Sequence, residues 1–403
     1  MRDVVITGMG IVSPFGIGLD LHWRKLIDRQ SCIKEITTID TEAIKTKFAG
    51  IIDNDLYYKN ISKVELNNLD QYTQLSIIAI KLCLEHAGLL DSPKNNIGLI
   101  LGTGFGTIQT TEKVYNNSFN LKKPVFPRTI VKAMNNAAAS EAAIKYQLQG
   151  FNQTVFTACS SGTNAIGQAY RYIKDGYGDC MVAGGVDTSI TSIMLKSWDK
   201  LRVLSTHNEN PIKASRPFCK YRDGFALSEG AGFFVLESKD HALKRNAKIH
   251  AELAGYASNC DAKHITSPSY QQQVNAIYDA IQDAGLLVDD IDMINAHGTS
   301  TVLNDATESK SINSIFKRQL PVTALKSQFG HTIGASGAIE TIISILMMQK
   351  DLLLPSINYT EKDSECNINL VLNKPLKKRI NSFVKNSFGF GGNNAVLVVK
   401  KYS

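Results

Sequence analysis

A single cysteine stands where an apolar segment gives way to a helical one. Residues 153–158 (QTVFTA) have the pattern of a buried strand, and residues 161–176 (SGTNAIGQAYRYIKDG) have that of a helix. Cys159 lies between them, where backbone N–H groups and the positive end of the helix would face its sulfur and favour the thiolate. Such a junction is the elbow that carries the nucleophile in acyl-transfer enzymes. We therefore expect a nucleophile with room for a thioester; a buried inert cysteine is the alternative.

Two histidines lie in similar places further along the chain. His297 ends the expected strand at residues 292–297 (DMINAH), and His331 follows the expected strand at residues 321–326 (PVTALK). Open α/β sheets place their active sites at the carboxyl ends of strands. A lone histidine there is more often structural, but two histidines and a cysteine at equivalent strand ends indicate one catalytic centre. A metal would need a third ligand spaced suitably near the histidines, and since neither flanking motif offers one, we expect no metal.

Three further side chains could support or cover this centre. Lys326 precedes His331, and Glu340 follows it on the next helix, where the two could fix the orientation and protonation of the imidazoles. A surface ion pair is the commoner fate of such residues. The segment SFGFGGNN (387–394) surrounds Phe390 with glycines that permit positive φ and close backbone approach. It fits equally a mobile loop that carries Phe390 over a pocket and a tight turn with a core phenylalanine.

The elements that would position these side chains alternate along the chain. Short β-branched runs alternate with longer helical patterns, which predicts an α/β architecture with buried parallel strands. The expected strands are residues 4–10, 97–104, 153–158, 180–187, 230–237, 251–258, 292–297, 321–326 and 394–401. The expected helices are residues 74–88, 161–176, 271–285, 305–318 and 336–351.

Two stretches of the chain are similar to each other. Residues 79–104 and 276–300 each contain a helical pattern, the letters AGLL, a polar turn and a strand that ends in a glycine-containing loop. This similarity suggests a duplicated α/β unit. We expect an N-terminal half, residues 1–245, that carries the cysteine, and a C-terminal half, residues 246–403, that carries both histidines and the glycine-rich loop.

Composition and motifs exclude several classes of protein. The 403 residues are 43% hydrophobic and lack an uncharged apolar run long enough for a membrane helix, so we expect a soluble, cytoplasmic protein with no membrane partner. The formal charge of +7 is spread along the chain, which argues against nucleic acid. Seven cysteines without a CxxC pair indicate neither a disulfide framework nor a zinc site. The segments ITGMGIVSPFG and GTGFGT miss the GxGxxG spacing of dinucleotide sites.

Taken together, these motifs resemble the β-ketoacyl-acyl-carrier-protein synthases of the type I/II group, within the thiolase-fold superfamily. The likeness spans essentially the whole chain. It rests on TACSSG (157–162), NAHGTST (295–301), KSQFGHTIGASGAIE (326–340) and NSFGFGG (386–392). The resemblance implies an α/β, thiolase-like five-layer αβαβα fold built from two duplicated halves, usually assembled as a dimer.

The resemblance also implies a role for each matching residue. Cys159 would take the acyl chain from acyl-carrier protein as a thioester. His297 and His331 would bind the malonyl thioester carbonyl, promote loss of CO₂ and stabilise the enolate that attacks the acyl-enzyme. Backbone N–H groups of Cys159 and Phe390 would hold the oxyanion. Lys326 and Glu340 match the family's supporting pair.

Other matches concern the substrate. Thr299 and Thr301 match residues that hydrogen-bond the phosphopantetheine arm of acyl-carrier protein, and Phe390 matches a gating phenylalanine. Phe105, in GTGFGT, aligns with a position that often lines the acyl pocket or the dimer contact, and its bulk would shorten the chains accepted. No catalytic cofactor is implied, because the substrates arrive on the carrier's arm.

The sequence departs from the family pattern at positions that bear on substrate and partner. Asn393 stands where threonine is usual, and Val302 where proline is common. Asn67 and Asn68 replace basic residues of the usual carrier-docking patch. The remaining candidates for meeting an acidic carrier helix are Lys122, Lys123 and Arg202. Residues 186–205 look more like a ketosynthase subunit of a type II polyketide or aryl-polyene system, which implies a heterodimer with a chain-length-factor-like paralogue; a fatty-acid homodimer is the alternative.

Two other functions remain open. A catalytically silent partner or scaffold subunit would not need a nucleophile, and Cys159 with both histidines argues against it. A cysteine hydrolase or acyltransferase would release a free acid or transfer the acyl group unextended, and the second histidine and the GFGG loop disfavour it. The sequence thus favours a carbon–carbon bond-forming condensing enzyme.

Overall fold

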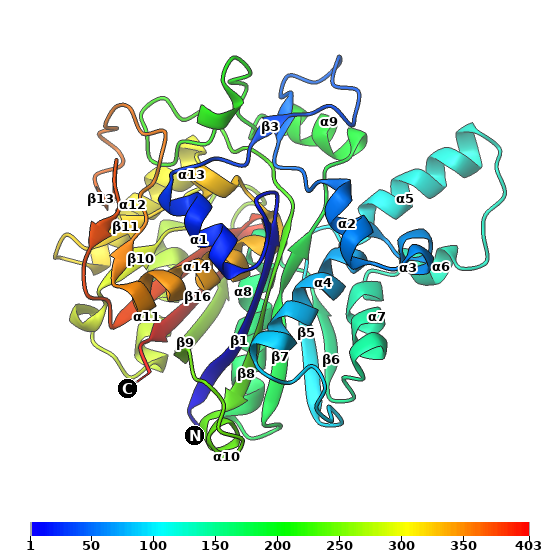
Figure 1. Cartoon of the computed structure of the whole chain (residues 1–403). Helices are drawn as coiled ribbons and strands as arrows, with labels where there is room; N and C mark the ends of the chain where they lie inside the picture. Colours follow the sequence, from blue (N-terminus) through cyan, green and yellow to red (C-terminus); the bar gives the residue numbers. More distant parts are fainter. Residues whose placement is uncertain (1, 403) are drawn as a thin grey trace.

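The computed structural model describes residues 2–402. Twelve of its strands form one mixed sheet built from two similar units, and two further pairs of strands form small separate sheets (Figure 1). In the first unit the strands lie side by side in the order β6-β5-β7-β8-β1. Their bounds are β1 (Val4–Ser13), β5 (Ile97–Gly102), β6 (Asn152–Val155), β7 (Cys180–Asp187) and β8 (Gly230–Ser238).

The second unit repeats this arrangement in the order β11-β10-β15-β16-β9. Its strands are β9 (Ala251–Cys260), β10 (Met293–Asn295), β11 (Pro321–Thr323), β15 (Ser382–Gly389) and β16 (Asn393–Lys400). Counted along the chain, the second strand of each unit pairs in parallel with the third and the fourth. The fifth strand is antiparallel to both its neighbours. The same order and the same directions in both units are what duplication of one α/β unit produces.

The expectation of parallel strands is wrong for four of the ten strands in these units, which have antiparallel neighbours only: β1, β8, β9 and β16. β8 lies between β7 and β1, and β16 lies between β15 and β9. A continuous apolar run indicates only that both faces of a strand are covered. Helices cover both faces of this sheet, whether the strands run parallel or antiparallel. Strand direction instead depends on the connections, such as the short turn between β15 and β16 that reverses the chain.

Helices complete five layers, in agreement with the expected αβαβα fold (Figure 1). The helices α4 (Gln71–His86) and α7 (Ala137–Tyr146) pack outside the first unit. The helices α8 (Ser161–Lys174) and α14 (Ser336–Lys350) contact each other between the two units, and α11 (Tyr270–Asp283) and α12 (Val302–Ile315) cover the far side. The central layer therefore meets the carboxyl-end loops of both units.

Helix α14 shows why the central layer forms. Every residue from Ser336 to Met348 is buried, because this helix has mostly apolar or small side chains around its circumference and lies between the two units of the sheet. A single exposed helix with this composition would leave apolar surface in water. Within residues 2–402, no helix combines the length and the apolar character that crossing a bilayer requires.

The remaining elements are short and lie mainly around the rims. An arm made of α5 and the following segment up to α6 projects from the body (Figure 1). These elements are β2 (Gly16–Ile17), α1 (Leu19–Ile27), β3 (Lys34–Glu35), β4 (Phe48–Ala49), α2 (Asn54–Asn60), α3 (Lys63–Asn68), α5 (Ile108–Tyr115), α6 (Thr129–Ala133), α9 (Ser192–Leu201), α10 (Lys239–Lys244), α13 (Lys326–Phe329), β12 (Leu352–Leu353), β13 (Asn369–Leu370) and β14 (Leu376–Lys377).

Among the ten strands of the two units, β15 is the one that the sequence does not predict. Residues 387–394 are expected to form either a mobile loop or a tight turn, but β15 runs through Ser387 to Gly389 and β16 begins at Asn393. Its buried polar residues Lys385, Asn386 and Ser387 hide the apolar pattern of a core strand. Their polarity is explained by the site described next.

Candidate active site

The candidate nucleophile lies at a strained elbow. Cys159 sits in a single 3-10 turn, Ala158–Ser160, between β6 and α8. Ala158 adopts a left-handed conformation with φ of 51°, which costs about 1–2 kcal/mol for a residue with a Cβ. The Oγ of Ser161 holds the elbow, because it accepts from the N–H of Thr157 at 2.9 Å and lies 2.7 Å from the carbonyl oxygen of Ala158. The elbow expected from the sequence is therefore present.

The end of β15 packs directly against this elbow. A Cβ added to Gly389 would lie 2.7 Å from the carbonyl oxygen of Thr157 and 3.2 Å from the backbone nitrogen of Cys159. Only glycine allows this approach. It brings the backbone N–H of Phe390 to the sulfur of Cys159, where hydrogen bonds from the N–H groups of Phe390 and Cys159 itself work to lower the pKa of the thiol. Two backbone donors thus converge at the reactive atom.

Both histidines converge on the same sulfur. The Sγ of Cys159 and one ring nitrogen from each of His297 and His331 lie within 4.8 Å of one another. The two rings are 5.4 Å apart at an interplanar angle of 82°, and all three residues are buried. His297 directly follows β10, as expected, whereas the short helix α13 separates His331 from β11. The three side chains come from both halves of the chain.

The hydrogen bonds of His331 fix its tautomer. The backbone N–H of Ile333 donates to Nδ1 at 3.2 Å, and Nδ1 also lies 2.9 Å from the Oγ of Ser336. Because a backbone N–H can only donate, Nδ1 is the acceptor, and the neutral ring carries its proton on Nε2. That N–H has no partner among the described residues. His331 therefore offers an unused donor inside a buried site.

Burial keeps all three reactive groups neutral at rest. It holds the pKa of both His297 and His331 well below the usual 6.5, and the positive charge of Lys326 adds to this effect. It also raises the pKa of Cys159 to about 12, although Lys326 and the N–H of Phe390 act in the opposite direction. The thiolate expected from the helix end is wrong, because loss of hydration outweighs the helix dipole.

Lys326 and Glu340 meet as expected, but not at the surface. Lys326, the first residue of α13, donates to Oε1 of Glu340 at 2.6 Å and to the carbonyl oxygen of His297 at 2.6 Å. Both members of the pair are almost fully buried. The ion pair therefore anchors the backbone of His297.

Sequence reasoning missed Glu308, which holds the other side of the same peptide group. Its carboxylate accepts from the N–H of His297 at 2.7 Å and from the N–H of Gly298 at 2.8 Å. Asn386 donates to it at 3.1 Å. The sequence offers no signal for it, because α12 (VLNDATESKSINSI) is polar overall and only the structure shows that Asp305 and Glu308 are buried.

Asp187 was also missed, although it ties three loops around the site. Its carboxylate accepts from the N–H groups of Gly104 at 2.7 Å, Phe105 at 3.1 Å and Gly334 at 2.7 Å. The hydroxyl of Thr103 donates to it at 3.0 Å. Burial raises the pKa of Asp187 to about 6, against the effect of these hydrogen bonds.

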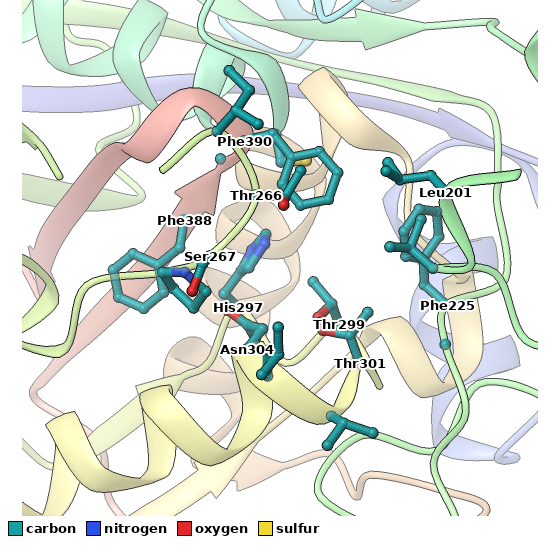
Figure 2. Close-up of a pocket in the computed structure, with 18 of the residues that line it drawn as sticks. Leu201, Phe225, Thr266, Ser267, His297, Thr299, Thr301, Asn304, Phe388 and Phe390 are labelled. Atoms are coloured by element: carbon teal, nitrogen blue, oxygen red, sulfur yellow. Dashed lines mark hydrogen bonds between the residues drawn. The ribbon is translucent and has the colours of Figure 1, made fainter. Parts of the chain in front are cut away.

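A pocket of about 300 Å³ leads to Cys159 and both histidines. Figure 2 shows His297 directed into its centre, Thr299 and Thr301 beside it, Phe390 above, and Leu201 with Phe225 on the facing wall. The hydroxyls of Thr299 and Thr301 are 2.8 Å apart and line the passage. The turn carrying Phe390 is therefore tight, and its phenylalanine still faces the pocket.

Phe105 lies behind the wall of this pocket rather than on it. Its ring meets Trp198 edge-on at 5.7 Å, and Trp198 lines the pocket. Trp198 also packs against Phe225 at 5.5 Å and Phe390 at 6.0 Å. These four aromatic rings form one barrier beside the thiol.

The candidate docking residues do not gather in one place. Arg202 follows α9 and lines the pocket. Lys122 and Lys123 are exposed on the projecting arm and are not among the residues that line the pocket. Asn67 and Asn68 end α3.

The two departures near the pocket have visible consequences. The side chain of Asn393 donates to the carbonyl oxygen of Phe390 at 3.1 Å, which closes the turn. Val302 is exposed at the start of α12 and lines the pocket. The first substitution adds a hydrogen bond to the turn, and the second adds apolar surface to the passage.

The chemistry of these side chains also raises the question of a metal. The sequence next to the histidines offers no third ligand, but the structure brings Cys159 to them from elsewhere in the chain, so three possible metal ligands lie together. Metal coordination would require the thiolate, which burial disfavours, and the ammonium group of Lys326 lies close to the histidines.

Comparison with known proteins agrees with this site. Residues 1–242 match the family model described as β-ketoacyl synthase, N-terminal domain, and residues 250–360 match β-ketoacyl synthase, C-terminal domain. A Staphylococcus aureus (strain N315) protein named 3-oxoacyl-(acyl-carrier-protein) synthase 2 is 37% identical over 410 residues, covering 100% of this chain and 99% of that protein.

Solved structures give the same result. The ishigamide ketosynthase/chain length factor has a TM-score of 0.94 and 30% identity, with 100% of both chains covered. A ketosynthase solved with its type II polyketide acyl-carrier protein has a TM-score of 0.91 and 29% identity, again covering both chains fully. On the strength of family matches to both halves and relatives similar over their full length, this chain belongs to the β-ketoacyl synthase family.

Proposed function

We propose that this protein catalyses the decarboxylative condensation of an acyl chain with a malonyl group, both delivered as thioesters of acyl-carrier protein. The acyl chain moves first to Cys159, which releases the carrier thiol. Malonyl-carrier protein then loses CO₂, and its enolate attacks the Cys159 thioester. The products are a β-ketoacyl-carrier protein and the free cysteine.

The first step needs a proton acceptor, because the Cys159 thiol is neutral at rest. A neutral imidazole is available within 4.8 Å. It takes the thiol proton as sulfur attacks and returns it to the departing carrier thiol. The N–H groups of Cys159 and Phe390, which already face the sulfur, stabilise the oxyanion of the tetrahedral intermediate.

The second step needs donors that remain neutral at physiological pH. Loss of CO₂ places negative charge on the thioester oxygen, and the Nε2–H of His331 is an unpaired donor in the site. His297 lies beside it with its backbone held by Lys326 and Glu308. We assign to Thr299 and Thr301, which line the passage, the role of hydrogen-bonding the phosphopantetheine arm.

The observation that carries this proposal is the convergence of Sγ and two neutral imidazoles at the end of one pocket. A cysteine hydrolase would need one histidine only. A silent partner subunit would have no need for a nucleophile at a strained elbow. The second histidine has a use only if a second anion must be stabilised.

The test is direct. The protein is incubated with a defined acyl-carrier protein and malonyl-carrier protein, and the carrier-bound products are weighed by mass spectrometry. We expect an acyl group longer by one CH₂–CO unit, together with released CO₂. Release of free acid, or transfer without extension, would contradict the proposal.

We also propose acyl-carrier protein and a second ketosynthase-fold subunit as partners. One relative is named for acyl-carrier protein, one neighbour was solved with its carrier, and another is a ketosynthase/chain length factor. Arg202 at the pocket is the best placed of the candidate docking residues, and Lys122 and Lys123 would meet the carrier only from the arm.

The dimer surface is expected at the open edge of the first unit. β6 is the last strand of the sheet, and Phe151 and Phe156 at its two ends are about half exposed. The adjacent arm exposes large apolar side chains that a partner would cover. They are Tyr115, Phe119, Leu121, Val125, Phe126, Ile130 and Val131.

We make four narrower proposals, which concern the acyl chain, the pathway, the boundary between the halves and the location. The aromatic barrier of Phe105 and Trp198 favours a short acyl chain. A type II polyketide or aryl-polyene pathway with a paralogous partner is our preference over a fatty-acid homodimer. We place the boundary between the halves at residue 245, between α10 and β9, where the second set of strands begins. The cytoplasm stays the expected location.

A further inference from the structure

A second lysine is buried beside the catalytic histidines, and the mechanism above does not use it. Lys385 lies in the middle of β15 with its side chain wholly inaccessible to solvent. Its ammonium nitrogen is 2.7 Å from Oε2 of Glu340, while Lys326 occupies Oε1 of the same carboxylate. Burying the ammonium group of a second lysine costs free energy, so we expect Lys385 to have a function in this core strand.

Lys385 closes a ring of polar contacts around the backbone of His297. On one side, Glu340 binds Lys326, which donates to the carbonyl oxygen of His297. On the other side, the N–H of His297 donates to Glu308, which accepts from the side chain of Asn386. Lys385 joins the two sides, because it donates to the carbonyl oxygen of Asn386 and pairs with Glu340.

The ring is balanced in charge when all its members are ionised. Lys326 from α13 and Lys385 from β15 face Glu340 from α14 and Glu308 from α12. Loss of the Lys385 charge would leave two carboxylates and one ammonium next to His297 and His331. The pKa of both imidazoles is lowered in part by Lys385, so this charge acts on the reactive groups directly.

We propose that Lys385 is a positioning residue for the decarboxylation step. Its ammonium group holds the ring around His297 and maintains the positive potential that makes both imidazoles good donors to the enolate. Acyl transfer to Cys159 should depend on it less, because the pKa of that thiol is shifted most by burial and, among nearby charges, by Lys326 and Asp187. This inference rests on the proposed function.

The charge should be lost in an accessible pH range. Burial lowers the pKa of Lys385 to about 8, although Glu340 opposes the shift. Cys159, at about 12, does not titrate nearby. The wild-type rate of malonyl-carrier decarboxylation should therefore fall on the alkaline side with an apparent pKa of about 8.

The experiment compares wild type with Lys385→Met and with Lys400→Met, a control at a partly exposed lysine on the neighbouring strand β16. Decarboxylation kcat and KM are measured from about pH 6 to about pH 10, and single-turnover acylation of Cys159 is measured separately. Lys385→Met should lose the alkaline limb and about tenfold in kcat at neutral pH, with KM unchanged and acylation within about twofold of wild type. Lys400→Met should match wild type.

An alkaline limb that persists in Lys385→Met, or equal loss in both half-reactions, overturns the assignment. A wild-type protein that neither decarboxylates nor condenses removes this inference together with the proposed function. Condensation with a pH profile indifferent to Lys385 removes this inference alone.

The variant should be less stable than wild type, because removing one member of a buried ion pair is destabilising, but it should still fold, because Glu340 keeps Lys326 as its partner. Thermal unfolding checks this. Should Lys385→Met fail to fold, Lys385→Gln takes its place, since its amide can still donate to the carbonyl oxygen of Asn386. Should neither fold, the wild-type profile decides: absence of the alkaline limb overturns the proposal.

Discussion

Cys159 and its two histidines show how burial sets the chemistry of individual residues. Desolvation raises the pKa of the thiol and lowers that of both imidazoles, so the resting site holds three neutral groups. A neutral imidazole can first accept the thiol proton and later donate to an enolate. One arrangement therefore serves two steps with opposite proton demands.

The reactivity of the thiol should rise steeply with pH. Because the pKa of Cys159 is about 12, its thiolate fraction grows about tenfold per pH unit through the neutral and mildly alkaline range. We expect iodoacetamide labelling of the Cys159 peptide to follow this slope, measured by mass spectrometry with the exposed Cys260 as a reference for the reagent. A labelling rate that is already level near neutral pH would show that the site favours the thiolate.

The two half-reactions should separate by mutation. Cys159→Ala is expected to abolish acyl transfer and to retain malonyl decarboxylation, because the enolate donors are untouched. His331→Ala removes the free Nε2–H donor and should slow decarboxylation by on the order of 100-fold or more. Single-turnover assays of each step measure both effects. Equal loss of both half-reactions in each variant would contradict these roles.

Condensation should not depend on a bound metal. The thiol would have to ionise to bind one, against its raised pKa. We expect dialysis against a chelator to leave the condensation rate unchanged, and elemental analysis of the purified protein to find less than one equivalent of metal. A rate that falls with chelator and returns with zinc would reverse this expectation.

At the scale of elements, the site depends on loops that come from three separate strands and helices. Asp187 at the end of β7 holds the N–H groups of Gly104 and Phe105 after β5 and of Gly334 before α14. Within residues 2–402, the carboxylate of Asp187 is the only hydrogen-bond acceptor of these three N–H groups. It joins both halves of the chain next to the nucleophile elbow.

Removing this acceptor should destabilise the protein. Asp187→Ala leaves three backbone donors without a partner in a buried site, and each such loss costs about 1–3 kcal/mol. Urea denaturation should show a lower free energy of unfolding. Asp223→Ala, at a partly exposed carboxylate on the pocket rim, provides the comparison. A midpoint equal to wild type in Asp187→Ala would mean that the loops hold each other by packing alone.

Asp187 also makes stability depend on pH. Its folded-state pKa of about 6 is higher than the ordinary 3.8, so its contribution is fully present below about pH 4 and is lost as the pH rises through 6. The hydrogen bonds to its carboxylate limit this loss. Because burial outweighs these hydrogen bonds, protonation of Asp187 in mild acid should not destabilise the folded protein.

At the scale of the whole molecule, the open edge of the sheet and the projecting arm leave apolar surface uncovered. β6 ends the sheet, and Phe126 and Ile130 on the arm are exposed. Natural proteins cover an edge strand of this kind or charge it, and this one has little charge on β6 itself. A dimer across this edge would satisfy both requirements.

Charges placed on the arm should therefore prevent assembly. We expect the wild type to sediment as a dimer, and Phe126→Asp with Ile130→Asp to shift it to monomer at micromolar concentration. Leu287→Asp, an equally exposed apolar residue in the other half, should leave the dimer intact. Dimers that survive the double substitution would place the interface elsewhere.

Much of this molecule was predictable from the order of its residues. The alternation of β-branched and helical runs located α4, α8, α11, α12 and α14 to within a few residues. Cys159, His297 and His331 were found because small and glycine-rich neighbours at strand ends are local signals. Strand β15 was missed because Lys385 and Asn386 carry charge and polarity into a core position, and only their partners from other elements explain them.

Residue types and their local spacing determined which groups would react, because nucleophiles, imidazoles and the glycines around them are visible in short windows. The tertiary structure alone decided their protonation and their support. Loss of hydration at Cys159, the ring that Lys385 closes and the loops that Asp187 joins each depend on segments that are far apart in the sequence, by up to 147 residues for Asp187 and Gly334. Electrostatic energy depends on distance in space and on exclusion of water, and neither quantity is contained in a stretch of chain.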